Sequence, residues 1–247
     1  MRIAVAGGTG VVGRYVVEAA RTAGHDVVVI ARSKKIDTIS GEGLARALEG
    51  VQVIVDTTNA GTIEEGPATE FFRKSSTNLQ RLGAAAGVGH LVVLSIVGID
   101  KAPTGYYAAK LAHEDGARQG DVATTIMRAT QFHEFAGQMI TWNREGSLAR
   151  IANLHVQTVA ARTVGRVLVE VAQGPAVGRA ADLGGPEREE LTSLARRLVE
   201  GRNLGIEILA VEDPDTPVGA LLAGEDARIE GPTFSEWLLS DDAAVFI

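Results

Sequence analysis

The sequence has 247 residues, of which 45% are hydrophobic and 22% charged. This is ordinary globular usage, and it excludes disorder, collagen and coiled coil. The formal net charge of -7 argues against nucleic acid as a direct partner, because an acidic chain repels phosphate backbones. The chain contains no cysteine, which excludes disulfides, thiolate metal sites and a cysteine nucleophile, and we expect no metal centre. A cytoplasmic location without membrane attachment is expected, because no apolar run approaches the length of a bilayer span.

In chain order, short β-branched runs alternate with helical patterns. Buried strands are predicted at residues 2–6, 27–30, 51–55, 91–94 and 125–127. Helices are predicted between them, at residues 11–23, 44–48, 68–86 and 106–118. The connection between the second and third of these strands is short, so we expect only a degenerate extra strand around residues 35–39. The alternation predicts an α/β fold with a doubly wound parallel sheet and helices on both faces.

The second half of the chain is less regular. Helices are predicted at residues 163–172, 191–201 and 234–239, and the last opens with the capping-box spacing of Thr233 and Glu236. With no repeat and no low-complexity linker in view, we predict one domain over residues 1–247. Its dinucleotide-binding core would span residues 1–130, and residues 131–247 would form mostly a small substrate lobe that does not fold independently.

A glycine-rich turn follows the first strand. Its glycine spacing fits both GxxGxxG and GxGxxG, and a strand before it with a helix after it is the context that a dinucleotide site requires. Glycines permit the tight turn and the close approach of a pyrophosphate to backbone amides at the helix N-terminus. The residues predicted to form this contact are Gly7, Gly8, Thr9, Gly10, Val11, Val12 and Gly13.

The residues after the second strand predict which dinucleotide binds. An NAD site needs a carboxylate there for the ribose hydroxyls, but the sequence continues Ala31-Arg32-Ser33. A planar cation suits the 2′-phosphate of NADP, so NADPH is predicted to be preferred over NADH, with contacts from Arg32 and Ser33. The alternative is that this basic segment is a solvated loop.

The other chemical groups predicted for the site follow later strands. Ser95 ends the fourth strand, and Tyr106 and Lys110 lie one helical turn apart on one face. The segments "AGGTGVVGRYVVEAA", "LSIVGID", "YYAAKLAHE" and "TTIMRATQFHEF" resemble the short-chain dehydrogenase/reductase superfamily, and more narrowly its atypical, NmrA-like NAD(P)H-binding branch. The likeness is strong over residues 1–140, and "DLGGPE" and "GPTFSEWL" extend it toward the C-terminus.

The resemblance implies a Rossmann fold and a set of residue roles. Tyr106 would donate a proton to a carbonyl, Lys110 would bind the nicotinamide ribose and lower the Tyr106 pKa, and Ser95 would orient the substrate. Tyr107 is the alternative to Tyr106 as the ring that faces the nicotinamide. Further contacts to the cofactor are expected from Thr58, Asn59, Thr130 and Gln131, and Phe132 and His133 would line the substrate pocket. His25, His90, His113 and His155 are interpreted as isolated surface or strand-end residues.

Three functions remain open on the sequence. The first is an NADP-dependent oxidoreductase acting on a small carbonyl, quinone or enone. The second is a non-catalytic NADP(H) redox sensor acting on a protein partner, which would not need the Tyr106/Lys110 pair. The third is a sugar-nucleotide epimerase, which is disfavoured because such enzymes usually run longer. The substrate and the oligomeric state are not predicted.

Overall fold

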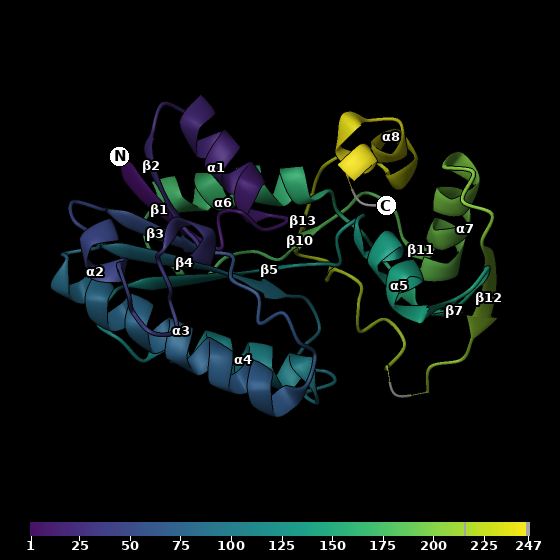
Figure 1. The fold of residues 1–247 in the computed structure, drawn as a ribbon, viewed down its shortest axis with the longest axis horizontal. Helices are drawn as coiled ribbons and strands as arrows, with labels where there is room; N and C mark the ends of the chain where they lie inside the picture. Colours follow the sequence, from purple (N-terminus) through teal and green to yellow (C-terminus); the bar gives the residue numbers. More distant parts are fainter. Residues whose placement is uncertain (215, 246–247) are drawn as a thin grey trace. The chain divides into compact units, whose positions relative to one another are not determined.

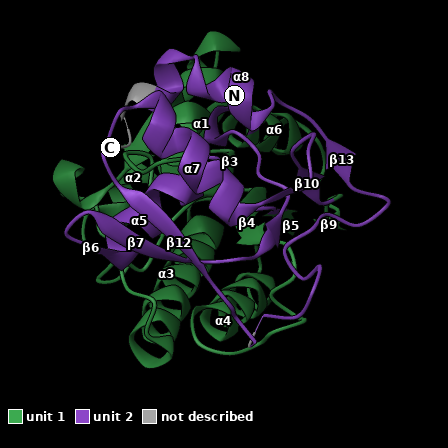
Figure 2. Ribbon diagram, turned by 90° about the vertical axis from the view of Figure 1, so that its right-hand side faces the viewer, with its two compact units in different colours: residues 1–128, 164–181 green, residues 129–163, 182–247 purple. Residues whose placement is uncertain are grey.

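The computed structural model of the protein describes residues 1–214 and 216–245. The chain forms two compact units, which Figure 2 distinguishes by colour. Unit 1 comprises residues 1–128 and 164–181, and unit 2 comprises residues 129–163 and 182–247. No helix among the described residues combines the length and the apolar character that crossing a membrane requires.

Unit 1 is built on a parallel sheet. Its strands run in the spatial order β5-β4-β3-β1-β2, with β9 beside β5. β1, β2, β3 and β4 are rich in Val, Ile or Leu, as strands covered on both faces require. Their bounds are β1 (Arg2–Ala6), β2 (Asp26–Ile30), β3 (Val53–Asp56), β4 (His90–Ile96), β5 (Thr124–Ala129, whose last residue belongs to unit 2) and β9 (Gly178–Arg179).

Helices cover both faces of this sheet. In Figure 1, α1 and α6 lie on one face, and α3 and α4 lie on the other. Their bounds are α1 (Gly13–Thr22), α2 (Leu44–Ala47), α3 (Glu65–Ala85), α4 (Tyr106–Arg118) and α6 (Ala161–Gln173). The α/β fold predicted from the alternating patterns, with its parallel sheet and helices on both faces, is confirmed.

The degenerate extra strand predicted at residues 35–39 is wrong. The chain instead forms the short 3-10 helix η1 (Arg32–Lys34) and then turns. Lys35 has a φ of 58°, a left-handed conformation that breaks any extended run. Leu44 and Leu48 then pack in the core beside Ile54, so this segment places α2 against the sheet.

Unit 2 contains smaller sheets and its own helices. β7 (Leu148–Ala152) pairs in parallel with β12 (Glu207–Val211) and antiparallel with β6 (Arg144–Glu145), and α5 (Phe135–Asn143) and α7 (Leu191–Gly201) pack on β7. The remaining elements are β8 (His155–Val156), β10 (Leu183–Gly184), β11 (Glu189–Glu190), β13 (Arg228–Ile229), α8 (Phe234–Leu238) and η2 (Asp241–Val245). The predicted capping box of α8 is confirmed, since Thr233 and Glu236 bond reciprocally.

The strand register of unit 1 determines where polar groups gather. Ala6 of β1 pairs with Ile30 of β2 and with Asp56 of β3, and Asp56 pairs with Val93 of β4. The carboxyl ends of β1, β2 and β3 therefore lie level, and β4 runs three residues further, at the edge where open α/β sheets bind ligands.

Candidate functional site

The glycine-rich turn begins at the carboxyl end of β1. Gly7 donates its N–H to Ile30 O at 3.0 Å, and Gly10 donates to Gly7 O at 2.8 Å. Gly7 has a φ of +74°, and a Cβ there would lie 2.8 Å from Thr57 O. Glycine is therefore required at position 7 for both conformation and space.

Two further glycines of the turn serve different purposes. A Cβ on Gly13 would overlap Gly7 O, so Gly13 is what lets α1 start directly against the turn. Gly10 has no positive φ, and a Cβ there would meet only Gly7 O, at 3.2 Å. The left-handed residue of this turn is therefore Gly7 and not Gly10. Gly10 is exposed and leaves space over the backbone.

This open space adjoins the start of α1. The N-cap residue is Val12, whose side chain cannot accept a hydrogen bond from the first amides of the helix. Thr9 and Val11 are exposed beside Gly10, whereas Gly8 and Val12 are buried. A helix N-terminus without a capping oxygen, next to backbone cleared of Cβ atoms, is a cradle that fits an anionic pyrophosphate.

The residues after β2 lie in an exposed helical turn. Arg32 and Ser33 belong to η1, and both are exposed. The hydrogen bond from Gly7 N to Ile30 O ties the end of β2 to the glycine-rich turn. A cationic, hydrogen-bonding segment thus follows the strand adjacent to the cradle.

A third segment of this edge follows β3. Thr58 donates its N–H to Asp56 Oδ1 at 2.9 Å, and Thr57 donates its hydroxyl to Ala6 O at 2.8 Å. The side chain of Asn59 is exposed, and its Oδ1 accepts a hydrogen bond of 2.8 Å from the hydroxyl of Tyr106. Tyr106 on α4 and Asn59 after β3 are therefore brought together.

The Tyr106 pKa differs from the expectation drawn from the family. Burial, and next the neighbouring Tyr107, raise the Tyr106 pKa to about 12, whereas the resemblance implied that Lys110 would lower it. The expected lowering is wrong for this structure because the Lys110 ammonium binds other partners. Tyr106 is protonated at neutral pH, as a proton donor must be.

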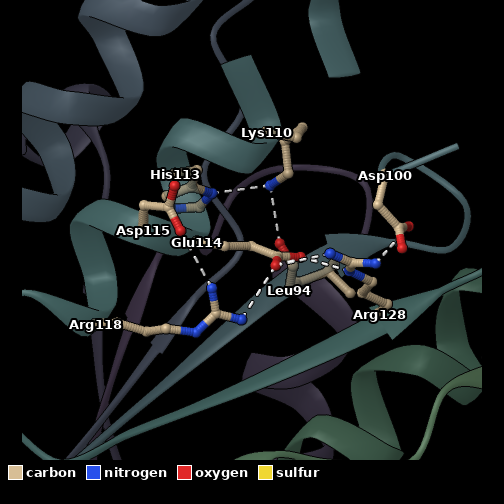
Figure 3. Close-up of polar contacts among 8 residues, drawn as sticks. All are labelled: Leu94, Asp100, Lys110, His113, Glu114, Asp115, Arg118 and Arg128. Atoms are coloured by element: carbon tan, nitrogen blue, oxygen red, sulfur yellow. Dashed lines mark hydrogen bonds and ion pairs between the residues drawn. The ribbon is translucent and has the colours of Figure 1, made fainter. Parts of the chain in front are cut away.

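Lys110 points into the interior of unit 1. Its Nζ donates to Leu94 O at 2.9 Å and bonds His113 Nδ1 at 2.9 Å (Figure 3), and it lies 4.7 Å from the centroid of the Phe72 ring. Burial lowers the Lys110 pKa to about 8, although the charges of Asp56 and Glu114 oppose this.

His113 is the residue that sequence reasoning missed. Its interpretation as an isolated surface or strand-end histidine is wrong, since it is fully buried and its Nε2 lies 2.9 Å from Asp56 Oδ2. Burial and the Lys110 charge lower the His113 pKa. The available signal was its position three residues after Lys110, which puts both side chains on one helix face.

Ser95 is buried within β4, beside an ion-pair cluster. Arg128 on β5 donates from Nε to Glu114 Oε1 at 2.6 Å and from Nη1 to Asp100 Oδ1 at 2.8 Å (Figure 3). Burial would raise the Glu114 pKa, but the hydrogen bonds and charge of Arg128 outweigh it and lower that pKa. Arg128 thus pairs with both carboxylates, and this ion-pair cluster was not predicted from the sequence.

The remaining predicted residues belong to unit 2. Thr130 donates its hydroxyl to Gln157 O, Gln131 O accepts from Val159 N at 2.9 Å, and Phe132 forms a β-bridge with Val159. Thr130 and Gln131 are buried, and Phe132 is half-buried. Their predicted contacts with cofactor or substrate stay predictions.

His133, predicted to line a substrate pocket, is 1% exposed and both its ring nitrogens are engaged. One nitrogen bonds Thr158 Oγ1 at 2.8 Å and the other bonds Pro232 O at 3.1 Å, while Phe234 and Trp237 pack against the ring. Burial lowers its pKa to about 4. Within unit 2, His133 thus links Thr158 and Pro232 by hydrogen bonds. Its role in lining a substrate pocket stays a prediction.

Comparison with known proteins agrees with this geometry. Residues 3–86, which contain the glycine-rich turn, η1 and Asn59, match the model of the NAD-dependent epimerase/dehydratase family. No curated protein matches the chain.

Solved structures match over nearly the whole chain. dTDP-4-dehydrorhamnose reductase from Yersinia enterocolitica is 17% identical, with 99% of this chain and 98% of that chain covered and a TM-score of 0.67. A short-chain dehydrogenase/reductase superfamily protein from Agrobacterium tumefaciens with bound NAD is 17% identical, with 99% and 96% covered and a TM-score of 0.71. The enzyme WbmH from Bordetella bronchiseptica, in complex with NAD+, is 16% identical, with 96% and 95% covered and a TM-score of 0.74.

These likenesses share one fold, and the family match covers the glycine-rich turn itself. The NmrA-like branch stays a prediction. Residues 3–86 match the NAD-dependent epimerase/dehydratase family model, and the chain shares its fold with the solved dTDP-4-dehydrorhamnose reductase and with the short-chain dehydrogenase/reductase superfamily protein.

Proposed function

We propose that the protein is an NADP(H)-dependent oxidoreductase that transfers hydride to or from a carbonyl carbon. The observation that carries this proposal is the hydrogen bond between Tyr106 and Asn59. It supports a protonated acid at the same sheet edge as the cradle formed by Gly7, Gly10 and Gly13. A turn with a purely structural role would not need a residue without a side chain at position 10. It would also not need the Tyr106 hydroxyl at the same edge of the sheet.

The cofactor would be held by the turn and by the segments beside it. The amides at the start of α1 would bind the pyrophosphate over Gly10, and Thr58 and Asn59 would contact the dinucleotide at the end of β3. When bound, the nicotinamide supplies or accepts the hydride. Arg32 and Ser33 would bind the 2′-phosphate, so we propose NADP rather than the NAD that several similar structures contain.

Side chains of this protein would supply the proton that the reaction needs. Tyr106, protonated at neutral pH, would donate its hydroxyl proton to the carbonyl oxygen during reduction, and Asn59 would orient that hydroxyl. Lys110, one turn along α4, would be the ammonium that stabilises the tyrosinate left on Tyr106 after this donation. Ser95 is proposed to orient the substrate from β4. Unit 2 is proposed as the substrate lobe, with Thr130 and Gln131 toward the cofactor and Phe132 and His133 toward the substrate.

A sugar nucleotide is a second candidate substrate class. The similar structures include a dTDP-4-dehydrorhamnose reductase and a UDP-N-acetylglucosamine 4-epimerase from Bacillus cereus, and the family model is named for epimerases and dehydratases. The argument that this chain is too short for such substrates is wrong, because the match covers 98% of the chain of the reductase. A ketone on a nucleotide-linked sugar is therefore within the proposal, as is an epimerase.

The decisive experiment is Tyr106→Phe, which removes the proton donor and keeps the ring that packs on Phe72. We expect turnover of an accepted carbonyl to fall ~10²–10⁴-fold while NADPH affinity barely changes. NADPH absorbance would be followed with quinones, enones, aldehydes, ketones and 4-keto sugar nucleotides, with Tyr107→Phe as the matched control.

Each alternative has its own outcome. If Tyr107→Phe is the damaging change, Tyr107 is the acid. If both variants match wild type on a good substrate, proton donation by tyrosine is wrong. If NADPH binds and nothing in the panel reacts, the redox sensor with a protein partner becomes the better account.

The cysteine-free composition supports placement in a reducing cytoplasm.

A further inference from the structure

Asp56, His113 and Lys110 form a buried hydrogen-bonded chain inside unit 1. His113 Nε2 lies 2.9 Å from Asp56 Oδ2, and His113 Nδ1 lies 2.9 Å from Lys110 Nζ. The exposed fractions of the three residues are 1%, 0% and 4%. Lys110 also donates to Leu94 O, so the chain runs from the end of β3, through α4, to the backbone of β4.

The chemistry of the partners fixes the proton on His113. An ammonium can only donate, so Nδ1 must accept from Lys110. Nε2 therefore holds the ring proton and donates it to the carboxylate of Asp56, which can only accept. The ring of Phe72 stacks on His113 with centroids 4.5 Å apart, which holds the imidazole plane. His113 is thus a neutral ring in one tautomer, between a buried cation and a buried anion.

Charged residues on α4 and on the neighbouring strands also affect the protonation of Lys110 and His113. Glu114 on α4 favours the charged forms of Lys110 and His113, and Asp56 on β3 does the same. Arg128 on β5 binds both carboxylate oxygens of Glu114. Asp56, bonded through His113, is therefore the anion that is linked to Lys110 by hydrogen bonds.

We propose that His113, oriented by Asp56, is a positioning residue that holds the Lys110 ammonium in place and exchanges its proton through the imidazole. In the exchange the Nζ–H bond of Lys110 breaks as Nδ1–H forms, and Nε2–H breaks as an O–H forms on Asp56. Charges of +1, 0 and -1 become three neutral groups, with no redox change. Lys110 can then change its protonation without contact with bulk water. Its link to turnover rests on the proposed function.

The first test measures the ring itself, without cofactor or substrate. Nitrogen-15 NMR of uniformly labelled protein at pH 7 distinguishes a protonated from a bare ring nitrogen. We expect His113 to show Nε2–H with a bare Nδ1. A ring protonated at Nδ1 alone, or at both nitrogens, would overturn the proposal whatever the enzyme does. Lys110→Met assigns the coupling, because it should change the Nδ1 signal of His113 and leave that of His25.

The second test is Asp56→Asn, with Asp115→Asn as the matched control. Asp115 is exposed on α4, the helix that carries His113, and its replacement removes the same charge. An amide at position 56 can satisfy either Thr58 N or His113 Nε2–H with its oxygen, but not both, so it disfavours the native tautomer. We expect kcat to fall about ten- to a hundredfold, the usual effect of losing a hydrogen bond to a charged group. The basic limb of the pH profile should move down by roughly one unit, because Lys110 loses a stabilising anion.

The outcomes separate the two proposals. Unchanged tautomer and pH profile in folded Asp56→Asn would overturn the positioning role. If Asp56→Asn does not fold, the wild-type ring spectrum and His113→Gln decide: the Gln amide can donate to Asp56 and accept from Lys110, but it cannot take up and release a proton as an imidazole does, so the pH profile should still shift. If wild type neither binds NADPH nor turns over, the proposed function fails, and the ring spectrum still decides the hydrogen-bonded chain.

Discussion

Arg32 is the residue proposed to select the cofactor, and it lies two residues after β2, exposed in η1. A charge-assisted hydrogen bond to a phosphate contributes about 1.5–3 kcal/mol, which corresponds to roughly ten- to over a hundredfold in affinity. We therefore predict that NADPH binds more tightly than NADH by this factor and that Arg32→Asp reverses or abolishes the preference. Titration of both cofactors by intrinsic fluorescence measures it.

The matched control is Arg46→Asp, which makes the same charge change at an exposed position of α2. It should leave the preference unchanged. Equal affinities for the two cofactors in wild type, or a preference that Arg32→Asp does not alter, would contradict the role of Arg32.

For single residues, the sequence predicts which side chains share a helix face better than it predicts which groups bond to them. Tyr106 and Lys110 do share a helix face, but Tyr106 bonds Asn59, after β3, and Lys110 bonds the Leu94 carbonyl of β4, and no spacing along α4 can reveal these two partners. Asp56 lies more than fifty residues before His113. Because the pKa values depend on these long-range contacts, the high Tyr106 pKa and the low Lys110 pKa could not be predicted.

The packing of the turn between β1 and α1 leads to a prediction about the stability of the start of α1. Gly13→Ala places a methyl group against Gly7 O, so the start of α1 must move; we expect a loss of about 1–3 kcal/mol in unfolding free energy. Gly10→Val meets little of the protein itself, so stability should change less while NADPH affinity falls beyond detection. Chemical denaturation and NADPH titration on both variants measure the contrast.

Gly24→Ala is the control for substitution at an exposed glycine, although its φ of +79° adds backbone strain of its own. Retained NADPH affinity in Gly10→Val would mean that the phosphates lie elsewhere. Equal destabilisation by Gly10→Val and Gly13→Ala would show that packing against Gly7 O is not what distinguishes them.

Elements with a clear period and clear ends were predicted well. β1, α4 and α7 have the predicted bounds, and Pro67 lies in the first turn of α3 while Gly87 follows its end. The two-residue strands β6, β8, β9, β10 and β11 and the helix α5 were not predicted, because two-residue strands carry no period and Phe135–Asn143 is apolar on most sides. The five-residue strand β7 was not predicted either. The extra strand was predicted from the short connection after β2, in which nothing in the sequence marks Lys35 as left-handed.

For the whole molecule, two buried bases predict how stability depends on pH. His133 in unit 2 has a folded pKa of about 4, below its unfolded value of ~6.5. Lys110 in unit 1 has a folded pKa of about 8, below ~10.4. In both windows the unfolded state binds more protons, so stability rises with pH from about 4 to 6.5 and again from about 8 to 10.4.

Denaturation curves across pH measure this dependence. His133→Gln removes the titrating ring and should flatten the acid window while leaving the alkaline one. Lys110→Met should do the reverse, and so each variant is the control for the other. Stability that falls between pH 8 and 10 in wild type but not in Lys110→Met would contradict the burial of that ammonium.

At this scale the sequence predicted the sheet and helices of unit 1 because βαβ units repeat a strong pattern. The arrangement within unit 2 was not predicted, since its pairings, such as β7 with β12, join segments more than fifty residues apart. The glycine cradle was predictable from local spacing, and the buried hydrogen-bonded chain was not.

The absence of an extra strand beyond β2 has a consequence for self-association. Among residues 1–214 and 216–245, β2 pairs with β1 alone, so its outer side offers unpaired backbone groups to any extended peptide. Its sequence, Asp-Val-Val-Val-Ile, is strongly β-forming, and only Asp26 at one end and the basic residues of η1 at the other carry charge. Arg32 and Lys34 would therefore guard against edge-to-edge aggregation, and variants that neutralise them should lower the concentration at which the protein stays in solution.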